Sequence, residues 1–154
     1  AACQELKAMR AKEGAKLYED LYGKCATVEA LAASIAERAP QVVEEYRVKL
    51  NERIEKLLGA VDVDRARLAT EVALFADKAG IDEEIVRLGS HVTQFRAMLD
   101  GTEPAGRRLD FIVQEMNREF NTIGSKANDG EIVNLVISGK GEIEKIREQV
   151  QNIE

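Results

Sequence analysis

The chain has 154 residues, of which 32% are charged and only 5% aromatic, and its formal net charge is −6. This composition, rich in Ala, Glu, Lys, Leu and Arg, favours long helices over strands. No apolar run approaches the roughly 18 residues that span a bilayer, so no membrane partner is expected. The negative charge argues against a protein that coats itself in nucleic acid, and any such contact must be local.

Cysteine and histidine usage narrows the possible chemistry. Cys3 and Cys25 are too few and too far apart for a disulfide framework, and neither belongs to a CxxC pair. With His91 as the one histidine, a closed zinc site is not expected. Two reduced thiols fit a cytoplasmic protein, and the opening residues AACQELKAMR do not form a signal peptide.

Three helical segments are predicted in the first 59 residues. The first runs from about residue 2 to residue 22 and stops at Gly23, because glycine commonly follows the last turn of a helix. Thr27, followed by an acidic first turn, predicts the N-cap of a second helix that ends near Arg38. Pro40 either opens a new helix as its first residue or kinks one long helix. Residues 41–58 keep a near-heptad apolar period, which is typical of two long helices packed as a hairpin.

Two helices are predicted between residues 62 and 99. Asp62 or Asp64 caps the shorter one, which turns Leu68, Val72 and Phe75 inward. The sequence AGID then marks a break, and acidic residues at 82–84 suit the positive end of the next helix. That helix carries an apolar stripe formed by Ile81, Ile85, Leu88, Val92, Phe95 and Leu99. A polar row lies beside the stripe and consists of Glu84, Arg87, His91 and Gln94.

Residues 106–127, GRRLDFIVQEMNREFNTIGSKA, carry the most informative predicted helix. One face is apolar at steps of three and four, with Leu109, Ile112, Val113, Met116, Phe120 and Ile123. The other face includes Asn117, Asn121 and Thr122, which are mediocre helix formers because they offer the backbone competing hydrogen bonds. We therefore expect their polar groups to be used elsewhere. No basic patch interleaved with aromatic residues appears, so a stacking platform for single strands is not expected.

The sequence DGTEPA at residues 100–105 predicts a tight turn, so the helices on its two sides should be antiparallel neighbours. With the bend centred near Glu103, residues equidistant from it lie level. This places His91 level with Glu115, Arg87 near Glu119, and Glu84 near Thr122. From Arg87 to Lys126 there are six basic and five acidic residues, a balance of +1 that leaves −7 for the remainder. Any nucleic-acid contact is therefore expected here.

A last helix is predicted from Glu131 to the end of the chain. Its apolar rhythm skips position 139, where a glycine stands, and Gly141 follows. Each glycine costs roughly 1 kcal/mol relative to alanine in a helix interior, which puts the rigidity of this helix in question. Residues 1–154 are thus expected to form one all-α domain, a bundle of about six mostly antiparallel helices in long hairpins. Leftover apolar positions suggest self-association and include Phe75, Met98 and Val133.

Two long sequence segments resemble the C-terminal half of the YicC/YloC family of bacterial proteins. They are LDFIVQEMNREFNTIGSKAND at 109–129 and EKIREQVQNIE at 144–154. Weaker family-like words are MRAKEG at 9–14 and FADKAGIDEEIVRLGSHVTQF at 75–95. Gly139 and Gly141 depart from the family, which usually has larger, helix-favouring residues there. The resemblance implies a fragment whose separate N-terminal domain is absent.

The same resemblance implies a metal-dependent endoribonuclease that cleaves single-stranded or structured RNA and assembles as a homo-oligomer. RNA cleavage needs a base, an acid and charge compensation at phosphorus, which histidine, carboxylates and a divalent cation such as Mg²⁺ or Mn²⁺ supply. By their chemistry and their spacing about the bend, the candidate catalytic residues are His91, Glu115 and Glu119, with Glu115 and Glu119 also as metal ligands. The candidate RNA-binding residues are Arg87, Arg107, Arg108, Asn117, Arg118, Asn121 and Lys126.

Each of these residues also has a purely structural interpretation. A lone histidine on a helix commonly bonds between helices, and Glu115 or Glu119 with Arg118 could be an ordinary ion pair within one helix. Asp82, Glu83 and Glu84 are most simply acids at a helix start. The alternative function is accordingly a helical oligomerisation or interaction module of an RNA-processing or stress-response protein, without catalysis of its own.

Overall fold

The computed structural model describes residues 2–59, 64–101 and 105–151. Over these residues the protein consists of five α-helices and no strand. They are α1 (Ala2–Leu58), α2 (Arg65–Ala79), α3 (Asp82–Leu99), α4 (Gly106–Lys126) and α5 (Gly130–Val150). The all-α prediction is confirmed, although the number of helices is five in this part of the chain where about six were expected.

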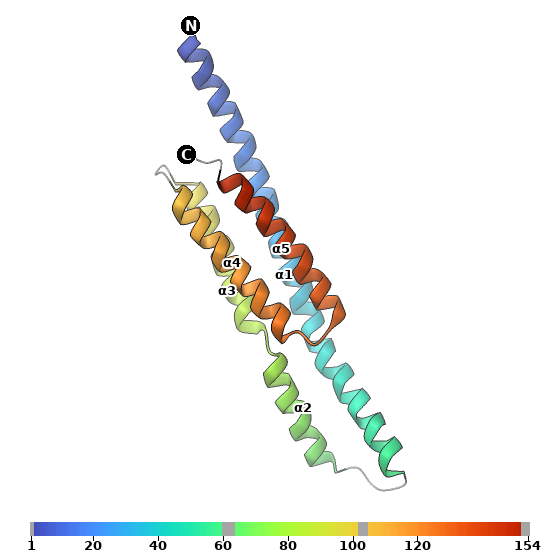
Figure 1. Ribbon diagram of the computed structural model, residues 1–154. Helices are drawn as coiled ribbons and strands as arrows, with labels where there is room; N and C mark the ends of the chain where they lie inside the picture. The colour runs from blue at the N-terminus through green and yellow to red at the C-terminus, as the bar shows by residue number, and fades with distance from the viewer. Residues whose placement is uncertain (1, 60–63, 102–104, 152–154) are drawn as a thin grey trace.

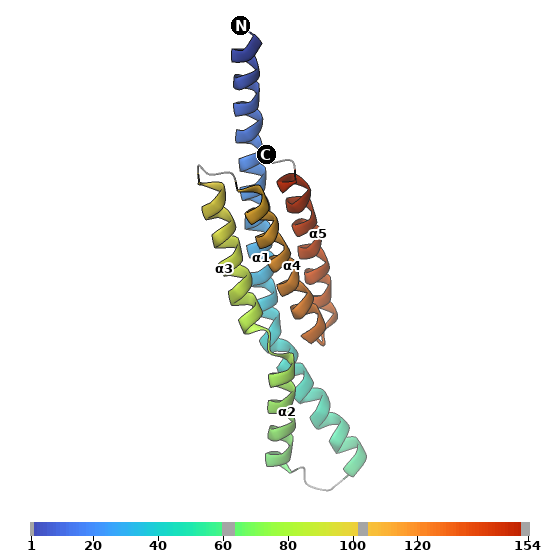
Figure 2. The same cartoon turned by 60° about the vertical axis from the view of Figure 1, so that its left-hand side comes forward.

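The middle of α1 forms a four-helix bundle with α3, α4 and α5. In this bundle α1 packs against α3 and α5, and α4 packs against the same two helices from the other side. Neighbouring helices run in opposite directions (Figures 1 and 2). The N-terminal part of α1 extends past one end of the bundle, and α2 with the last part of α1 extends past the other.

The predicted breaks at Gly23 and Thr27 are wrong, because α1 is continuous through both residues. Thr27 does not cap a helix; its hydroxyl donates to the Gly23 carbonyl oxygen of the preceding turn at 3.2 Å. The reason is tertiary, since one uninterrupted stripe of α1 is buried in the bundle. That stripe consists of Leu21, Cys25, Val28, Ala32, Ile35 and Val42. Burying it outweighs the cost of roughly 1 kcal/mol for a glycine inside a helix.

Pro40 lies inside α1, so of the two alternatives the structure contains the single long helix. Proline removes a backbone donor and costs about 3 kcal/mol in a helix interior. Buried residues stand on both sides of it, Ile35 at 0% and Val42 at 8% exposure, and they hold the two halves of the helix in the same packing. The fold-back predicted in this region therefore comes after Leu58, where α2 returns along α1.

The arm formed by α2 and the end of α1 is packed less deeply than the bundle. None of the residues of α2 is fully buried, and Leu68, Val72 and Phe75 are half-buried. Phe75 stacks on Tyr46 of α1 with the ring centroids 3.8 Å apart. Asp64 caps α2 by accepting from two backbone amides, whereas Asp62 lies outside the described residues.

The core of the bundle contains the predicted stripes of α3, α4 and α5. Phe95, Phe120, Leu88, Met116 and Ile146 are each 0% exposed. In the described part of the chain, no helix combines the length and the hydropathy needed to cross a membrane.

Candidate functional site

The predicted fold-back of α3 onto α4 is confirmed, and it sets charged side chains of the two helices against each other. Arg87 donates through Nε to Glu119 Oε2 at 3.2 Å, as the spacing predicted. Lys126 Nζ donates to Glu84 Oε1 at 2.8 Å, so Glu84 meets a residue one turn beyond the predicted Thr122. The bend centre at Glu103 lies outside the described residues. We call Glu84, Arg87, His91, Glu119 and Lys126 the α3–α4 cluster.

Glu84 is the most buried member of the cluster, with 3% of the residue exposed. Burial alone would raise the pKa of its carboxyl, but the hydrogen bond from Lys126 and the charge of Arg87 hold that pKa below its usual value. Its Oε1 also accepts from Arg87 at 3.1 Å, while its Oε2 is buried and has no hydrogen-bond partner in the part of the chain that the structure describes. Glu84 is therefore an ionised carboxylate inside the protein rather than an exposed acid at a helix start.

Arg87 connects the cluster. Its guanidinium donates to Glu83 at 3.0 Å, to Glu84 at 3.1 Å and to Glu119 at 3.2 Å. The side chain is 45% exposed, whereas that of Glu119 is 10% exposed. A planar guanidinium with five donors suits this arrangement, because it can bind several carboxylates and still face the solvent.

His91 approaches the same carboxylate from the next turn of α3. Its Nε2 lies 4.0 Å from Glu119 Oε1, too far for a direct hydrogen bond. Its Nδ1 is buried without a hydrogen-bond partner among the described residues, and the side chain is 18% exposed. The structure thus places His91 beside Glu119. The prediction placed His91 level with Glu115, which lies one turn earlier on α4.

Glu115 belongs to a separate contact on α4. It accepts from Arg118 at 2.9 Å, which is the ordinary three-residue ion pair of a helix surface. The Arg118 side chain is 73% exposed and that of Glu115 is 21% exposed. Of the three predicted catalytic residues, the structure therefore joins two and places the third beside a different arginine.

The other predicted RNA-binding residues spread over α4. Arg107 and Arg108 are exposed in its first turn, and Asn117 is half-buried. Asn121 faces α5, where its side-chain oxygen accepts from Lys140 at 2.7 Å. These residues do not join the α3–α4 cluster; they line the outer and α5-facing sides of the same helix.

The carboxylates do not by themselves fit a protein-bound metal ion. Among the described residues, no group of three or more His, Cys, Asp or Glu side chains is placed to hold one. The predicted ligands Glu115 and Glu119 are each engaged by an arginine, Arg118 and Arg87 respectively. Two such groups could serve a cation only together with other ligands, as when Mg²⁺ keeps waters and takes substrate phosphates.

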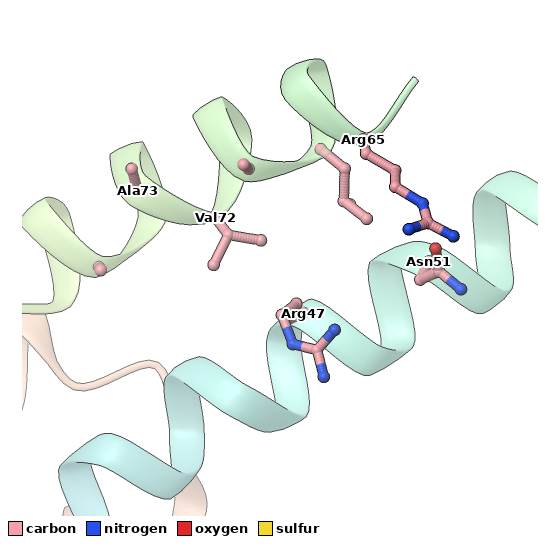
Figure 3. Close-up of a pocket in the computed structure, with 8 residues that line it drawn as sticks. Arg47, Asn51, Arg65, Val72 and Ala73 are labelled. Carbon is pink, nitrogen blue, oxygen red and sulfur yellow. The ribbon is translucent and has the colours of Figure 1, made fainter. Parts of the chain in front are cut away.

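A separate groove lies between α1 and α2, outside the bundle. Figure 3 shows Val72 and Ala73 of α2 on one side, Arg47 and Asn51 of α1 on the other, and Arg65 at the start of α2. None of the predicted site residues lines it. The groove is therefore not part of the candidate site.

The sequence pattern did not predict that Glu84 is a buried member of the site. It was placed correctly in the polar row of α3, but three consecutive acids are the usual signature of a helix start. The spacing of four between Arg87 and His91, and of seven between Glu84 and His91, puts all three on one face and was the available signal. Glu84 is the acid that becomes buried because it bonds to Lys126, which lies 42 residues further along the chain.

Comparison with known proteins places the chain among bacterial relatives. Residues 35–154 match the family model described as "Endoribonuclease YicC-like, C-terminal". The chain is 50% identical over 151 residues to "Probable endoribonuclease YicC" of Clostridioides difficile (strain 630), covering 97% of this chain and 52% of that protein. It is 33% identical over 147 residues to the protein of the same name from Haemophilus influenzae, covering 96% and 50%. The chain thus spans about half the length of the curated relatives it matches.

Proposed function

This chain belongs to the family described as "Endoribonuclease YicC-like, C-terminal", and on that premise we propose that the protein is an endoribonuclease whose active site includes the α3–α4 cluster. The observation that supports this most is the position of His91 beside Glu119, which Arg87 holds from its other oxygen. The matched residues 35–154 include the whole cluster. Two relatives that carry the name probable endoribonuclease align over nearly all of this chain.

In this proposal His91 carries out proton transfer during RNA cleavage. Because Nδ1 is buried, Nε2 is the nitrogen that exchanges a proton with the ribose 2′-hydroxyl or with water. Glu119, 4.0 Å away, stabilises the imidazolium that forms. Arg87 keeps Glu119 oriented and presents the exposed part of its guanidinium to the scissile phosphate.

The substrate-binding part of the proposal concerns α4 and the edge of the cluster. Arg107, Arg108 and Arg118 are exposed cations that suit phosphates, and Lys126 lies at the open end of the α3–α4 contact with 37% of its side chain exposed. Asn117 and Asn121 carry amides that can bond to bases or to 2′-hydroxyl groups. We propose RNA as the partner, cleavage in the cytoplasm, and a homo-oligomer as the working form.

Metal dependence is a further part of the proposal. A divalent cation that arrives with the RNA phosphates would need one carboxylate from the protein, and Glu115 suits this because its partner Arg118 is highly exposed and easily displaced. Such a cation would supply charge compensation at the phosphate. Binding of Mn²⁺ to the protein should then be weak alone and strengthen when RNA is present.

The test is cleavage of RNA by the full-length protein with single substitutions. His91→Ala should lower the rate by roughly 10²- to 10⁴-fold while circular dichroism stays helical. Gln94→Ala, an exposed residue on the next turn of α3, is the matched control and should cleave normally. Glu115→Gln should also lose cleavage, and raised Mn²⁺ should restore part of it. Normal rates for His91→Ala would refute the assignment.

A second candidate is the interaction module without catalysis. Its specific support is that Glu84 and Glu119 are already neutralised by Lys126 and Arg87, as in a purely structural ion-pair network. On this alternative, cleavage survives His91→Ala but falls when assembly is lost. Ile143 and Ile146 of the α5 stripe are buried in the bundle, so polar changes there would unfold it and would not report on assembly. The exposed Ile137 of α5, changed to Asp, is the suitable probe.

A further inference from the structure

In the described part of the chain, one aromatic ring is neither buried nor stacked on another ring. The chain has four Phe and three Tyr. Tyr18 packs on Tyr22 and Tyr46 on Phe75, while Phe95 and Phe120 are completely buried. Phe111 has neither burial nor a ring contact, and it is 59% exposed.

Phe111 is an exposed residue of α4. This helix lies on the side of the bundle opposite α1 (Figure 2). Arg107, Phe111, Gln114 and Arg118 follow each other at steps of four, three and four, so they form one stripe along the helix. All four residues are exposed. The stripe contains two positive charges and no acidic residue.

This stripe has the composition of a single-strand binding surface. Arginines attract phosphates, and an exposed ring between them offers a flat face to a base. Arg107 and Arg118 lie eleven residues apart, roughly 16 Å along the helix axis, which several nucleotides of one strand can cover. Of the other exposed apolar residues, Val86 and Ile137 are aliphatic and cannot stack in this way, and the ring of Tyr18 already packs on Tyr22.

We propose that Phe111 is a base-stacking subsite for single-stranded RNA, with Arg107 and Arg118 binding the phosphates on either side. The inference rests on the proposed endoribonuclease function and narrows its substrate to unpaired RNA. Aromatic spacing in the sequence gives no sign of a stacking surface, because a single ring forms no run. The structure adds the exposure of that ring and the two arginines of its stripe. Arg118 also bonds to Glu115, so RNA bound at the stripe lies next to a residue proposed for the reaction.

The experiment measures the dissociation constant of the protein for a short fluorescein-labelled single-stranded RNA and for a duplex of the same sequence. Phe111→Ala should weaken single-strand binding by roughly 5- to 100-fold and leave duplex binding unchanged. Phe111→Trp should keep the affinity, since the larger ring still stacks. Leu74→Ala removes a comparably exposed apolar side chain, 50% exposed on α2, and should have no effect.

The outcomes separate this inference from the proposed function. If the unmodified protein binds and cleaves RNA while Phe111→Ala binds single strands equally well, the subsite is refuted and the enzyme is not. An equal loss on single strands and duplex also refutes stacking. A changed sedimentation coefficient of Phe111→Ala with unaltered RNA binding would mean that the ring contacts another copy of the protein instead. If the unmodified protein neither binds nor cleaves RNA, both proposals fail together.

Discussion

The ring of Phe120 on α4 occupies the space that a side chain at position 139 of α5 would need. A Cβ added to Gly139 would overlap Cζ and Cε1 of that ring, and Phe120 is 0% exposed. The gap that Gly139 leaves in the apolar rhythm of α5 is therefore filled by a residue of the neighbouring helix. The glycine lets the two helices approach each other closely, as small residues do at tight helix contacts.

Gly139 and Gly141 should respond in opposite ways to the same substitution. Gly139→Ala should lower the free energy of unfolding by about 1–3 kcal/mol, because overpacking of the Phe120 ring exceeds the gain in helix propensity. Gly141→Ala meets nothing within 4 Å and should raise that free energy by up to about 1 kcal/mol. Urea unfolding followed by circular dichroism measures both. Equal effects of the two substitutions would contradict the assigned packing.

Glu84 should be important for stability as well as for the proposed site. Glu84→Gln should lower the free energy of unfolding by about 1–3 kcal/mol at pH 7, because it removes the buried carboxylate that Lys126 and Arg87 share. Glu83→Gln is the matched control, since Glu83 pairs with the same Arg87 but its side chain is 76% exposed. Its effect should stay within about 0.5 kcal/mol. A cost for the control as large as that for Glu84→Gln would show that burial does not matter here.

Asp129 should contribute to the acid sensitivity of the fold. It caps α5 and accepts two bonds from Arg38 of α1, at 2.8 Å and 3.1 Å. These bonds from Arg38 hold the pKa of Asp129 below its usual value. A lowered pKa in the folded state means that the stabilisation is present above the unfolded value near 3.9 and is lost as the pH falls through the folded value.

The measurement is the difference in unfolding free energy between pH 7 and pH 3. In Asp129→Asn this difference should be smaller than in the unmodified protein, because the substituted side chain no longer titrates. Glu131→Gln alters the neighbouring acid, whose side chain is 66% exposed and also contacts Arg38, and should change the difference little. An unaltered pH dependence in Asp129→Asn would contradict the prediction.

The thiol of Cys25 should react slowly in the native protein. Burial raises its pKa to about 11, a shift that the charge of Arg96 opposes, and the residue is 0% exposed. Because the thiolate is the reactive form, a Cys3→Ser variant should react slowly with a thiol reagent at pH 8 and rapidly in urea. Comparable rates in the two conditions would show that α1 does not stay packed at this position.

The sequence alone determined the features that depend on local pattern and near neighbours. Apolar periodicity predicted the α3, α4 and α5 stripes, and a short connection predicted that α3 and α4 are antiparallel. Asp64 was one of two residues predicted to cap α2. Two long sequence segments were enough to predict the family. Each of these signals lies within a few dozen residues, where spacing along a helix fixes which side chains share a face.

The tertiary structure decided what depends on burial by distant segments. It joined α1 through Gly23 and Pro40, because α3 and α5 bury one continuous stripe of that helix. Glu84 was expected at a solvent-exposed helix start, but it is buried and bonds to Lys126. The space beside Gly139 is filled by the ring of Phe120. In each case the local preference is worth about 1–3 kcal/mol, and packing against a partner far along the chain outweighs it.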